Sequence, residues 1–255
     1  MLQRCAAARH SRAMIVLFTD FGLAGPYTGQ LEAVLHQAAP GVPVISLFAD
    51  APAGQPKPAA YLLAAYAAWF PAGSVLLCVV DPGVGSRRRA LIVEADGRRY
   101  VGPDNGLLEL VLRRAAAARC WEITWQPRLL SASFHGRDLF APVAARLARG
   151  EPESSVAARV APLRHNDWPD DLREIVYVDH YGNALTGMRG DCLSDGARLL
   201  AGERRISHAE TFSAVPPDEA FWYVNSNGLV EIAVNGGRAD RVLGLGIGSA
   251  VSPLP

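Results

Sequence analysis

The first 150 residues alternate between short apolar runs and longer segments of helical character, and this alternation constrains the fold more than any other feature. Apolar runs predict strands at 14–19, 42–47 and 74–80. Helical patterns cover 26–37, 57–69, 107–118 and 138–149. Asp96-Gly97 between two further apolar runs is typical of a hairpin. Together these segments predict an α/β domain with a mainly parallel sheet and helices on both faces.

The pattern changes after Gly150. Residues 151–171 carry prolines and acidic residues with little periodicity, which predicts a linker. From residue 172 to 255, short apolar runs are separated by Gly/Asn turns such as Asn227-Gly228, which predicts a small antiparallel β-barrel domain. We therefore expect an N-terminal domain over 14–150, a C-terminal domain over 172–255 and a flexible tail over 1–13. That tail is basic but lacks the continuous apolar core of a signal peptide.

Charge and cysteine usage exclude several classes of partner. The chain has 25 basic residues (Lys and Arg) and 25 acidic residues (Asp and Glu). The resulting net charge of zero does not indicate binding to nucleic acid or to an anionic membrane. No apolar stretch approaches the ~20 residues of a membrane helix. The four cysteines form no CxxC or Cys/His pair that would indicate a metal site. We expect a cytoplasmic protein with reduced thiols, no metal and no organic cofactor.

Polar residues follow two of the predicted strands directly, where open α/β sheets collect ligands. Thr19-Asp20-Phe21-Gly22 follows the first strand, and a segment from Asp81 to Arg88 with two glycines follows the strand at 74–80. A plain Pro-Gly turn with a solvated basic run explains the second segment equally well. A third cluster, Phe134-His135-Gly136-Arg137-Asp138, precedes a predicted helix, where a histidine is commonly a cap or a surface residue.

Three further polar segments have both a local and a functional interpretation. The loop at 101–106 has a backbone suited to lining a site, but a simple turn accounts for it as well. The segments 178–183 and 225–228 contain Asn and Asp, which are common in turns for local reasons. From the residues alone, the turn interpretation is favoured for both.

The motifs gain specificity from their joint order along the chain. Thr-Asp-Phe-Gly, Val-Asp-Pro-Gly-Val-Gly-Ser-x-Arg-Arg, Pro-Asp-Asn-Gly-Leu-Leu, Phe-His-Gly-Arg-Asp, Asp-x-Tyr-Gly-Asn and Asn-Ser-Asn-Gly occur in this order. From about residue 15 to the C-terminus the chain resembles the SAM hydroxide adenosyltransferases, or SAM hydrolases, relatives of the fluorinase and chlorinase halogenases. The resemblance implies a homotrimer that binds its substrate SAM between the first domain of one subunit and the second domain of its neighbour.

The resemblance also implies roles for individual residues. The catalytic trio corresponds to Asp81, Arg88 and His135, and Asp20 corresponds to the carboxylate that holds the ribose hydroxyls. The remaining residues implied in substrate binding are Gly136, Asp179, Tyr181, Asn183, Tyr223, Ser226, Glu231 and Val234. Among these, Tyr181 and Asn183 match adenosine contacts, and Asp179 and Ser226 match contacts to the methionine moiety.

Three positions depart from the family's pattern. Gly25 stands where an acidic residue is usual, Phe48-Ala49-Asp50 replaces a Thr/Ser-His-Glu segment, and Gly187 follows Thr186 in place of an asparagine. The catalytic trio is intact, so these departures bear on efficiency and substrate preference more than on the type of reaction.

In the hydrolysis of SAM that the resemblance implies, the costly requirement is activation of the nucleophile. Methionine leaves as a neutral thioether and needs no acid, whereas full ionisation of water at pH 7 costs about 12 kcal/mol. One arginine in contact with hydroxide contributes about 4 kcal/mol at an effective dielectric of about 20. A base must therefore accept a proton as water attacks C5′ of the ribose, and both His135 and Asp81 are candidates.

Two other functions are to be compared with hydrolysis. A SAM-dependent halogenase is disfavoured because the Asp81 carboxylate would repel a halide, because Gly136 stands where fluorinases have a serine, and because residues 89–101 lack the extra loop of fluorinases. A SAM- or nucleoside-binding protein without catalysis remains open, given the departures at Gly25 and Ala49.

Overall fold

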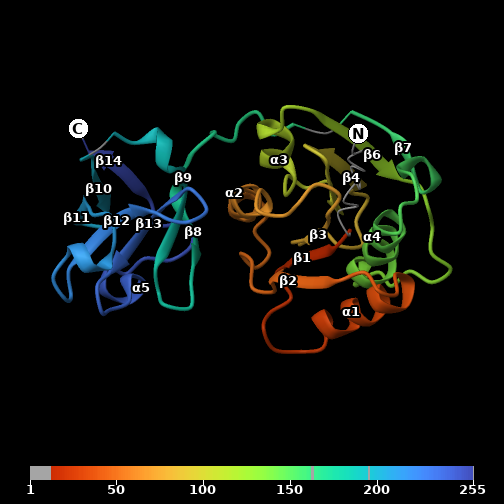
Figure 1. The fold of residues 1–255 in the computed structure, drawn as a ribbon, viewed down its shortest axis with the longest axis horizontal. Coiled ribbons are helices and arrows are strands. Elements are labelled where there is room, and N and C mark those ends of the chain that lie inside the picture. The colour runs from red at the N-terminus through yellow and green to blue at the C-terminus, as the bar shows by residue number, and fades with distance from the viewer. Residues whose placement is uncertain (1–12, 162–163, 195, 255) are drawn as a thin grey trace, which may run out of the picture.

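The computed structural model of the protein describes residues 13–161, 164–194 and 196–254. In this part of the chain, fourteen strands form two seven-stranded sheets that lie side by side, with helix α2 (Pro56–Ala67) between them (Figure 1). The expected two-domain α/β architecture is thereby confirmed. Residues 1–12, nearly all of the tail expected to be flexible, lie outside the described residues.

The first sheet has the strand order β2-β1-β3-β5-β4-β6-β7. Its strands are β1 (Ile15–Thr19), β2 (Val44–Phe48), β3 (Val75–Val79), β4 (Ala90–Ala95), β5 (Arg98–Pro103), β6 (Ala118–Ile123) and β7 (Ala157–Arg159). The strands β2, β1, β3 and β5 are parallel, whereas β4, β6 and β7 pair antiparallel. The predicted hairpin joins β4 to β5, with Asp96 and Gly97 at φ of +47° and +78°. The sheet is thus parallel in the half that carries the candidate motifs.

Helices cover both faces of this sheet because its central strands are apolar on both sides. Along β1, Ile15 and Leu17 face the core beneath α1 (Tyr27–Ala38) and α4 (Ala141–Ala148). Val16 and Phe18 face the opposite core beneath α2 and α3. Helix α3 (Glu109–Arg114) is shorter than the predicted 107–118, since the chain is already in β6 at Ala118.

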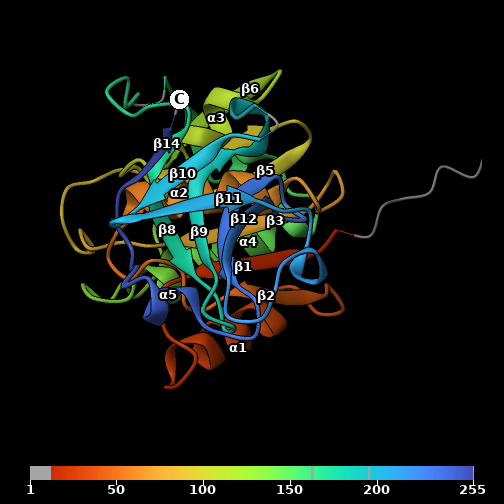
Figure 2. The ribbon, with the colours of Figure 1, turned by 90° about the vertical axis from the view of Figure 1, so that its left-hand side faces the viewer.

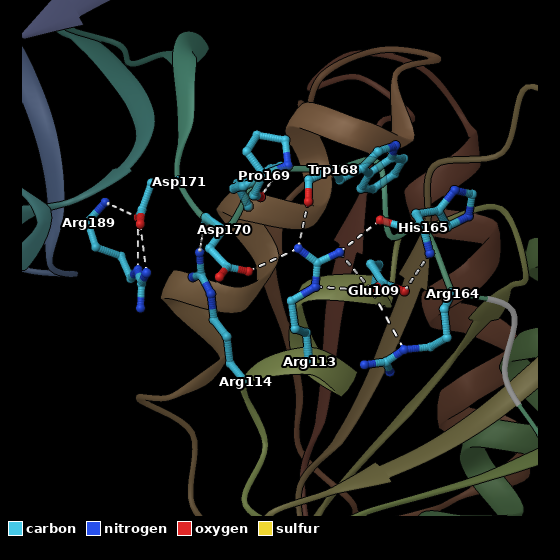
Figure 3. A network of polar contacts seen from close by, with 11 residues as sticks. Glu109, Arg113, Arg114, Arg164, His165, Trp168, Pro169, Asp170, Asp171 and Arg189 are labelled. Carbon is cyan, nitrogen blue, oxygen red and sulfur yellow. Dashed lines mark hydrogen bonds and ion pairs between the residues drawn. The ribbon is translucent and has the colours of Figure 1, made fainter.

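The segment expected to be a linker contributes structure to the first domain. Strand β7 lies within residues 151–171 and pairs with β6. Farther along, Arg113 of α3 donates hydrogen bonds to the carbonyl oxygens of His165 and Trp168 at 2.8 Å, and pairs with the carboxylate of Asp170 (Figure 3). Through these bonds, residues 164–171 pack against the surface of the first domain.

The second sheet has the order β14-β10-β11-β12-β13-β9-β8 and faces the viewer in Figure 2. Its strands are β8 (Leu172–Val178), β9 (Ala184–Arg189), β10 (Arg198–Ala201), β11 (Arg204–His208), β12 (Ala220–Val224), β13 (Leu229–Val234) and β14 (Val251–Leu254). Among the described strands, β11 and β12 pair in parallel and the other neighbours are antiparallel. A bridge between Glu174 and Ala250 links the two ends, so the sheet nearly closes into the predicted barrel.

The two domains share a core. Leu172, Val176 and Leu185 of the second sheet belong to the same apolar cluster as the buried side chains of α2. The close pairing of β8 with β9 bears on one departure from the family pattern. A Cβ at Gly187 would lie 2.7 Å from Cβ of Leu172, so β9 has no room there for a side chain beside β8. In the described part of the chain, no helix combines the length and apolarity needed to cross a membrane.

Candidate active site

The parallel half of the first sheet brings two carboxylates to the same edge. In the register of β1 and β3, Thr19 pairs with Val79, so both strands end at one level. Asp20 follows β1, and its amide donates to the carbonyl oxygen of Val79 at 3.3 Å. Asp81 follows β3 after one further residue, Val80. The edge at which ligands were expected therefore carries both acidic side chains.

Asp81, Arg88 and His135 form one continuous chain of contacts. The Nε atom of Arg88 donates to both carboxylate oxygens of Asp81, at 2.9 and 2.8 Å, and its Nη2 atom also contacts that carboxylate. The same Nη2 atom lies 3.1 Å from Nδ1 of His135. The side chains of Arg88 and Asp81 are 9% and 4% exposed, so little water screens the pair. The structure thus brings together the three residues predicted from separate motifs.

The contact with Arg88 fixes the role of the His135 ring. Arginine has no acceptor, so Nδ1 must accept the hydrogen bond, and a neutral ring then carries its proton on Nε2. Burial lowers the pKa of His135, the positive charge of Arg88 lowers it further, and Asp81 and Asp138 act in the opposite direction. His135 is therefore neutral at pH 7 and presents an N–H donor from Nε2.

A glycine allows the loops that carry these residues to meet. Gly85 has φ of +80°, and a Cβ there would lie 2.5 Å from the carbonyl oxygen of Ala132, in the loop before His135. Gly136 is also crowded, because its Cβ would lie 3.0 Å from the ring of Phe21. A serine at position 136 would require Phe21 to move.

Asp20 has a structural partner as well as a place in the site. Its Oδ2 atom accepts a hydrogen bond from the amide of Gly54 at 2.8 Å, which holds the loop before α2. Burial raises the pKa of Asp20, the Gly54 hydrogen bond opposes that rise, and the charge of Asp81 adds to it. A carboxylate accepts about four hydrogen bonds, so this arrangement leaves capacity for a ligand.

A small cavity opens between these loops. Its volume is about 130 Å³. Its lining includes Asp20, Asp81, His135 and Gly136, together with the rings of Phe21 and Phe134. Binding sites for whole small molecules are usually about 300–1,000 Å³. By itself, this cavity is therefore large enough for only the reacting part of a SAM-sized ligand. A cavity of about 480 Å³ adjoins it and shares Asp20, Phe21, Ser133 and Phe134 with it.

A larger cavity of about 710 Å³ lies in the second domain. All seven residues predicted there from the second-half motifs line it, namely Asp179, Tyr181, Asn183, Tyr223, Ser226, Glu231 and Val234. The backbone amide of Asn183 donates to Asp179 at 2.8 Å, and its side-chain amide donates at 3.1 Å. These turns therefore combine local hydrogen bonding with a place in a cavity.

Glu231 is the most buried carboxylate of this larger cavity. It is 5% exposed, Tyr223 donates a hydrogen bond to Oε1, and Asn225 donates to Oε2 at 2.8 Å. Burial raises the pKa of Glu231, whereas the bonds from Tyr223 and Asn225 act against that rise. Burial, reinforced by the Glu231 contact, raises the pKa of Tyr223 well above its usual value, so its hydroxyl remains a donor.

The predicted site residues of one chain therefore fall into two groups. The described residues lining the two cavities have no member in common. The catalytic trio and Asp20 belong to the first domain, and the seven residues from the later motifs belong to the second. Within one chain, a single ligand in contact with both groups would have to extend from one cavity into the other.

Some lining residues were missed, and one candidate loop is structural. Tyr66 and Phe212 line the larger cavity without belonging to any motif. Asn225 opens the Asn-Ser-Asn-Gly motif, which was the signal for it. In the loop at 101–106, the side chain of Asn105 donates to the carbonyl oxygen of Val80 at 2.9 Å, so this loop braces the end of β3.

No cluster of three or more His, Cys, Asp or Glu side chains is placed to hold a metal ion in the described residues. The polar groups of both cavities are instead carboxylates, amides, hydroxyls and one imidazole, which suit hydrogen bonding to an organic ligand.

Comparison with known proteins gives one family along nearly the whole chain. Residues 15–157 match the SAM hydroxide adenosyltransferase N-terminal domain, and residues 173–252 match the C-terminal domain. A relative named (R)-S-adenosyl-L-methionine hydrolase, from Salinispora arenicola, is 38% identical, covering 91% of this chain and 94% of its own. A fluorinase from Actinopolyspora mzabensis is 22% identical, covering 89% and 92%. The crystal structure of an uncharacterized conserved protein from Thermotoga maritima matches with a TM-score of 0.85 at 30% identity, covering 95% of this chain and 100% of that one.

Proposed function

The chain belongs to the SAM hydroxide adenosyltransferase family, and from that premise we propose that it hydrolyses S-adenosyl-L-methionine to adenosine and L-methionine. The observation that carries the proposal is the contact chain from Asp81 through Arg88 to His135, which lies beside Asp20 at the carboxyl edge of the sheet. It supplies a carboxylate, a fixed cation and a neutral imidazole next to a cavity large enough for the reacting atoms.

In the proposed reaction, a water molecule attacks C5′ of the ribose and methionine leaves as a neutral thioether. We assign the proton acceptor to Asp81. Nδ1 of His135 already accepts from Arg88, so the free Nε2–H donates to the water and orients it. Arg88 occupies one side of the Asp81 carboxylate and stabilises negative charge as the water loses its proton.

The same residues disfavour a halogenase. The buried carboxylate of Asp81 would repel a desolvated halide, and a side chain at Gly136 would fit only if the ring of Phe21 moved. SAM is the substrate in this proposal, and the described residues hold no cluster suited to a metal. We place the reaction in the cytoplasm, where the free thiols of Cys78, Cys120 and Cys192 stay reduced.

We further propose that each active site is shared between subunits of a homotrimer. The smaller cavity would take the reacting centre and the ribose, and the larger cavity of a neighbour would take the rest of SAM. Support comes from the separation of the two residue groups within one chain. It also comes from Tyr27, which is 50% exposed and whose ring lies 5.5 Å from that of Phe134 in the lining of the smaller cavity.

The direct test is a product assay. Purified protein, treated with a chelator and then incubated with SAM, is expected to release adenosine and methionine in equal amounts. Added chloride or fluoride should leave the product unchanged. Tight binding of SAM without release of adenosine would support the binding-protein alternative, and loss of activity that zinc or magnesium restores would contradict a metal-free reaction.

The protonation state of His135 predicts the acid limit of the reaction. Because burial and Arg88 lower its pKa, His135 stays neutral below the usual pKa of about 6.5. Hydrolysis should therefore be retained at pH 6.5 and fall only at lower pH, as His135 gains a proton and repels Arg88. The measurement is kcat against pH for wild type and His135→Gln, whose amide cannot titrate. An acid limb that is the same in both proteins would assign it to another group, such as Asp20.

Asp20 predicts a preference for the ribose 2′-hydroxyl. A site built to bind a hydroxyl discriminates against its absence, because buried polar groups are left unpaired. The 2′-deoxy analogue of SAM should be the poorer substrate, and Asp20→Ala should narrow the difference in kcat/KM. If Asp20 serves only to hold the amide of Gly54, the variant should lose stability while the preference stays unchanged.

A further inference from the structure

Tyr66 is a residue of the first domain that lines the cavity of the second. It lies in the last turn of α2, and every other described residue lining this cavity falls within 179–237. The cavity therefore has one wall from the helix between the two domains. Because α2 belongs to the same chain as the cavity, this wall is present in each subunit by itself.

The ring of Tyr66 is held in place by aromatic contacts at the domain joint. Its centroid lies 5.1 Å from that of Phe48, at an interplanar angle of 80°. The ring of Phe48 in turn lies 5.3 Å from that of Tyr177, whose hydroxyl donates to Asp50 at 2.9 Å. Edge-to-face contacts of this kind favour one ring orientation. The Phe48-Ala49-Asp50 departure thus supplies the support for Tyr66.

The hydroxyl end of Tyr66 lies toward the cavity. The groups that act on its charge state are Glu231 and Asp179, together with the side chain of Asn227. All three residues line the cavity. Burial raises the pKa of Tyr66 to about 12, and the two carboxylates contribute to that rise. The hydroxyl is therefore protonated at neutral pH and available as a donor.

A donor at this point complements the other groups of the cavity. The charged residues among the described lining are the carboxylates Asp179 and Glu231, which are acceptors when ionised. SAM presents donors, such as its amino groups, and also acceptors, which are the ring nitrogens of adenine and the methionine carboxylate. A cavity that binds one end of SAM uses neutral donors beside its carboxylates, and Tyr66 adds one to the amides and hydroxyls already in the lining.

We propose that Tyr66 is a substrate-binding residue that donates a hydrogen bond from its hydroxyl to an acceptor atom of SAM held in the larger cavity of the same chain. The inference rests on the proposed function. It adds to the residues of the second domain a contact from the first domain, and this contact depends on how α2 is packed against the barrel.

The test compares two tyrosines of one helix. Tyr66→Phe keeps the ring on Phe48 and removes the donor, so KM for SAM should rise about two- to tenfold, as expected for one neutral hydrogen bond, while kcat changes less than about twofold. Tyr61→Phe is the matched control, because the Tyr61 hydroxyl donates to the carbonyl oxygen of Pro169 in the connecting segment. It should lower the melting temperature and leave KM unchanged. An unchanged KM in Tyr66→Phe, or an equal rise in both variants, would overturn the proposal.

Binding measurements separate this inference from the proposed function. Calorimetric titration of SAM into Asp81→Asn protein, with and without Tyr66→Phe, reports affinity without turnover, and adenosine is titrated in parallel. Weaker binding of both ligands indicates an adenine nitrogen as the acceptor, and weaker binding of SAM alone indicates the methionine carboxylate. Hydrolysis of SAM by wild type with unchanged affinity in Tyr66→Phe would refute only the role of Tyr66. A wild-type protein that binds SAM without hydrolysing it would refute only the proposed reaction.

Discussion

Replacing Asp81 with asparagine should reduce kcat for SAM hydrolysis by about 10²–10⁴-fold, the range typical for loss of a general base. The asparagine side chain has nearly the same shape but cannot accept the proton of the attacking water. SAM affinity should change much less, because Asp81 acts on the water and other residues hold the substrate. The measurement is single-turnover release of adenosine together with the dissociation constant for SAM.

His135 provides the companion variants, and they distinguish a base from a donor. If Nε2–H only orients the water, His135→Gln should retain more activity than His135→Ala, because the glutamine amide still offers an N–H. If His135 is instead the proton acceptor, both variants should lose activity equally. Near-normal turnover in Asp81→Asn would remove Asp81 from the proposed chemistry.

Folding must be checked in the Asp81 variant, because the Asp81–Arg88 pair is almost fully buried. Removing one partner of a buried ion pair costs about 3–5 kcal/mol when the other charge is left uncompensated. Asp81→Asn keeps a polar acceptor for the Arg88 guanidinium, so a smaller loss is expected. Retained SAM binding at low temperature would show that lost activity reflects chemistry rather than unfolding.

Sequence periodicity predicted the fold class well because the central strands of the first sheet are apolar throughout. It could not place β7, since Ala157–Arg159 is three residues long and is recognisable only from its pairing with β6. It also could not show that half of the sheet is antiparallel. Whether a strand pairs parallel or antiparallel depends on which strand lies beside it, and periodicity does not identify that neighbour.

The motifs predicted the candidate site residues, but not how the structure divides them. Asp81, Arg88 and His135 come together because Gly85 allows two loops to touch, which is a tertiary property. The separation of the two cavities likewise depends on how the barrel packs against α2. Tyr66 had no signal, because a tyrosine among apolar helical residues has the same pattern as a core residue.

That separation leads to a second prediction with a large effect, the recovery of activity from two inactive chains. Asp81→Asn inactivates the cavity of the first domain. Ser226→Trp blocks the larger cavity, and because Ser226 is exposed the bulky side chain should not prevent folding. Asp81→Asn alone should be at least about 100-fold less active than wild type, since a general base contributes about 10²–10⁴-fold. Ser226→Trp alone should lose activity because SAM can no longer enter the larger cavity.

Mixed oligomers of the two variants should regain activity if each site combines the first domain of one subunit with the second domain of its neighbour. With equal amounts and random assembly, a site is intact when the Ser226→Trp chain supplies its first domain and the Asp81→Asn chain supplies its second. Each condition is met about half the time, so about one quarter of wild-type activity is expected in a closed ring of subunits. The one-quarter value applies to the unfractionated mixture; if two different affinity tags, used in sequence, isolate the mixed trimers, about one third is expected, because each mixed ring has one intact site in three.

A second mixture supplies the control, because it gives different values in the two arrangements. Wild-type chains assembled with equal amounts of the Asp81→Asn/Ser226→Trp double variant should also show about one quarter of wild-type activity if sites are shared, since both contributing chains must be wild type. If each chain carries a complete site, this mixture should instead show about one half, and the mixture of single variants should stay as inactive as its components. The latter pair of results would mean that the two cavities come together within one subunit by domain movement, and that the proposed trimer does not build the site.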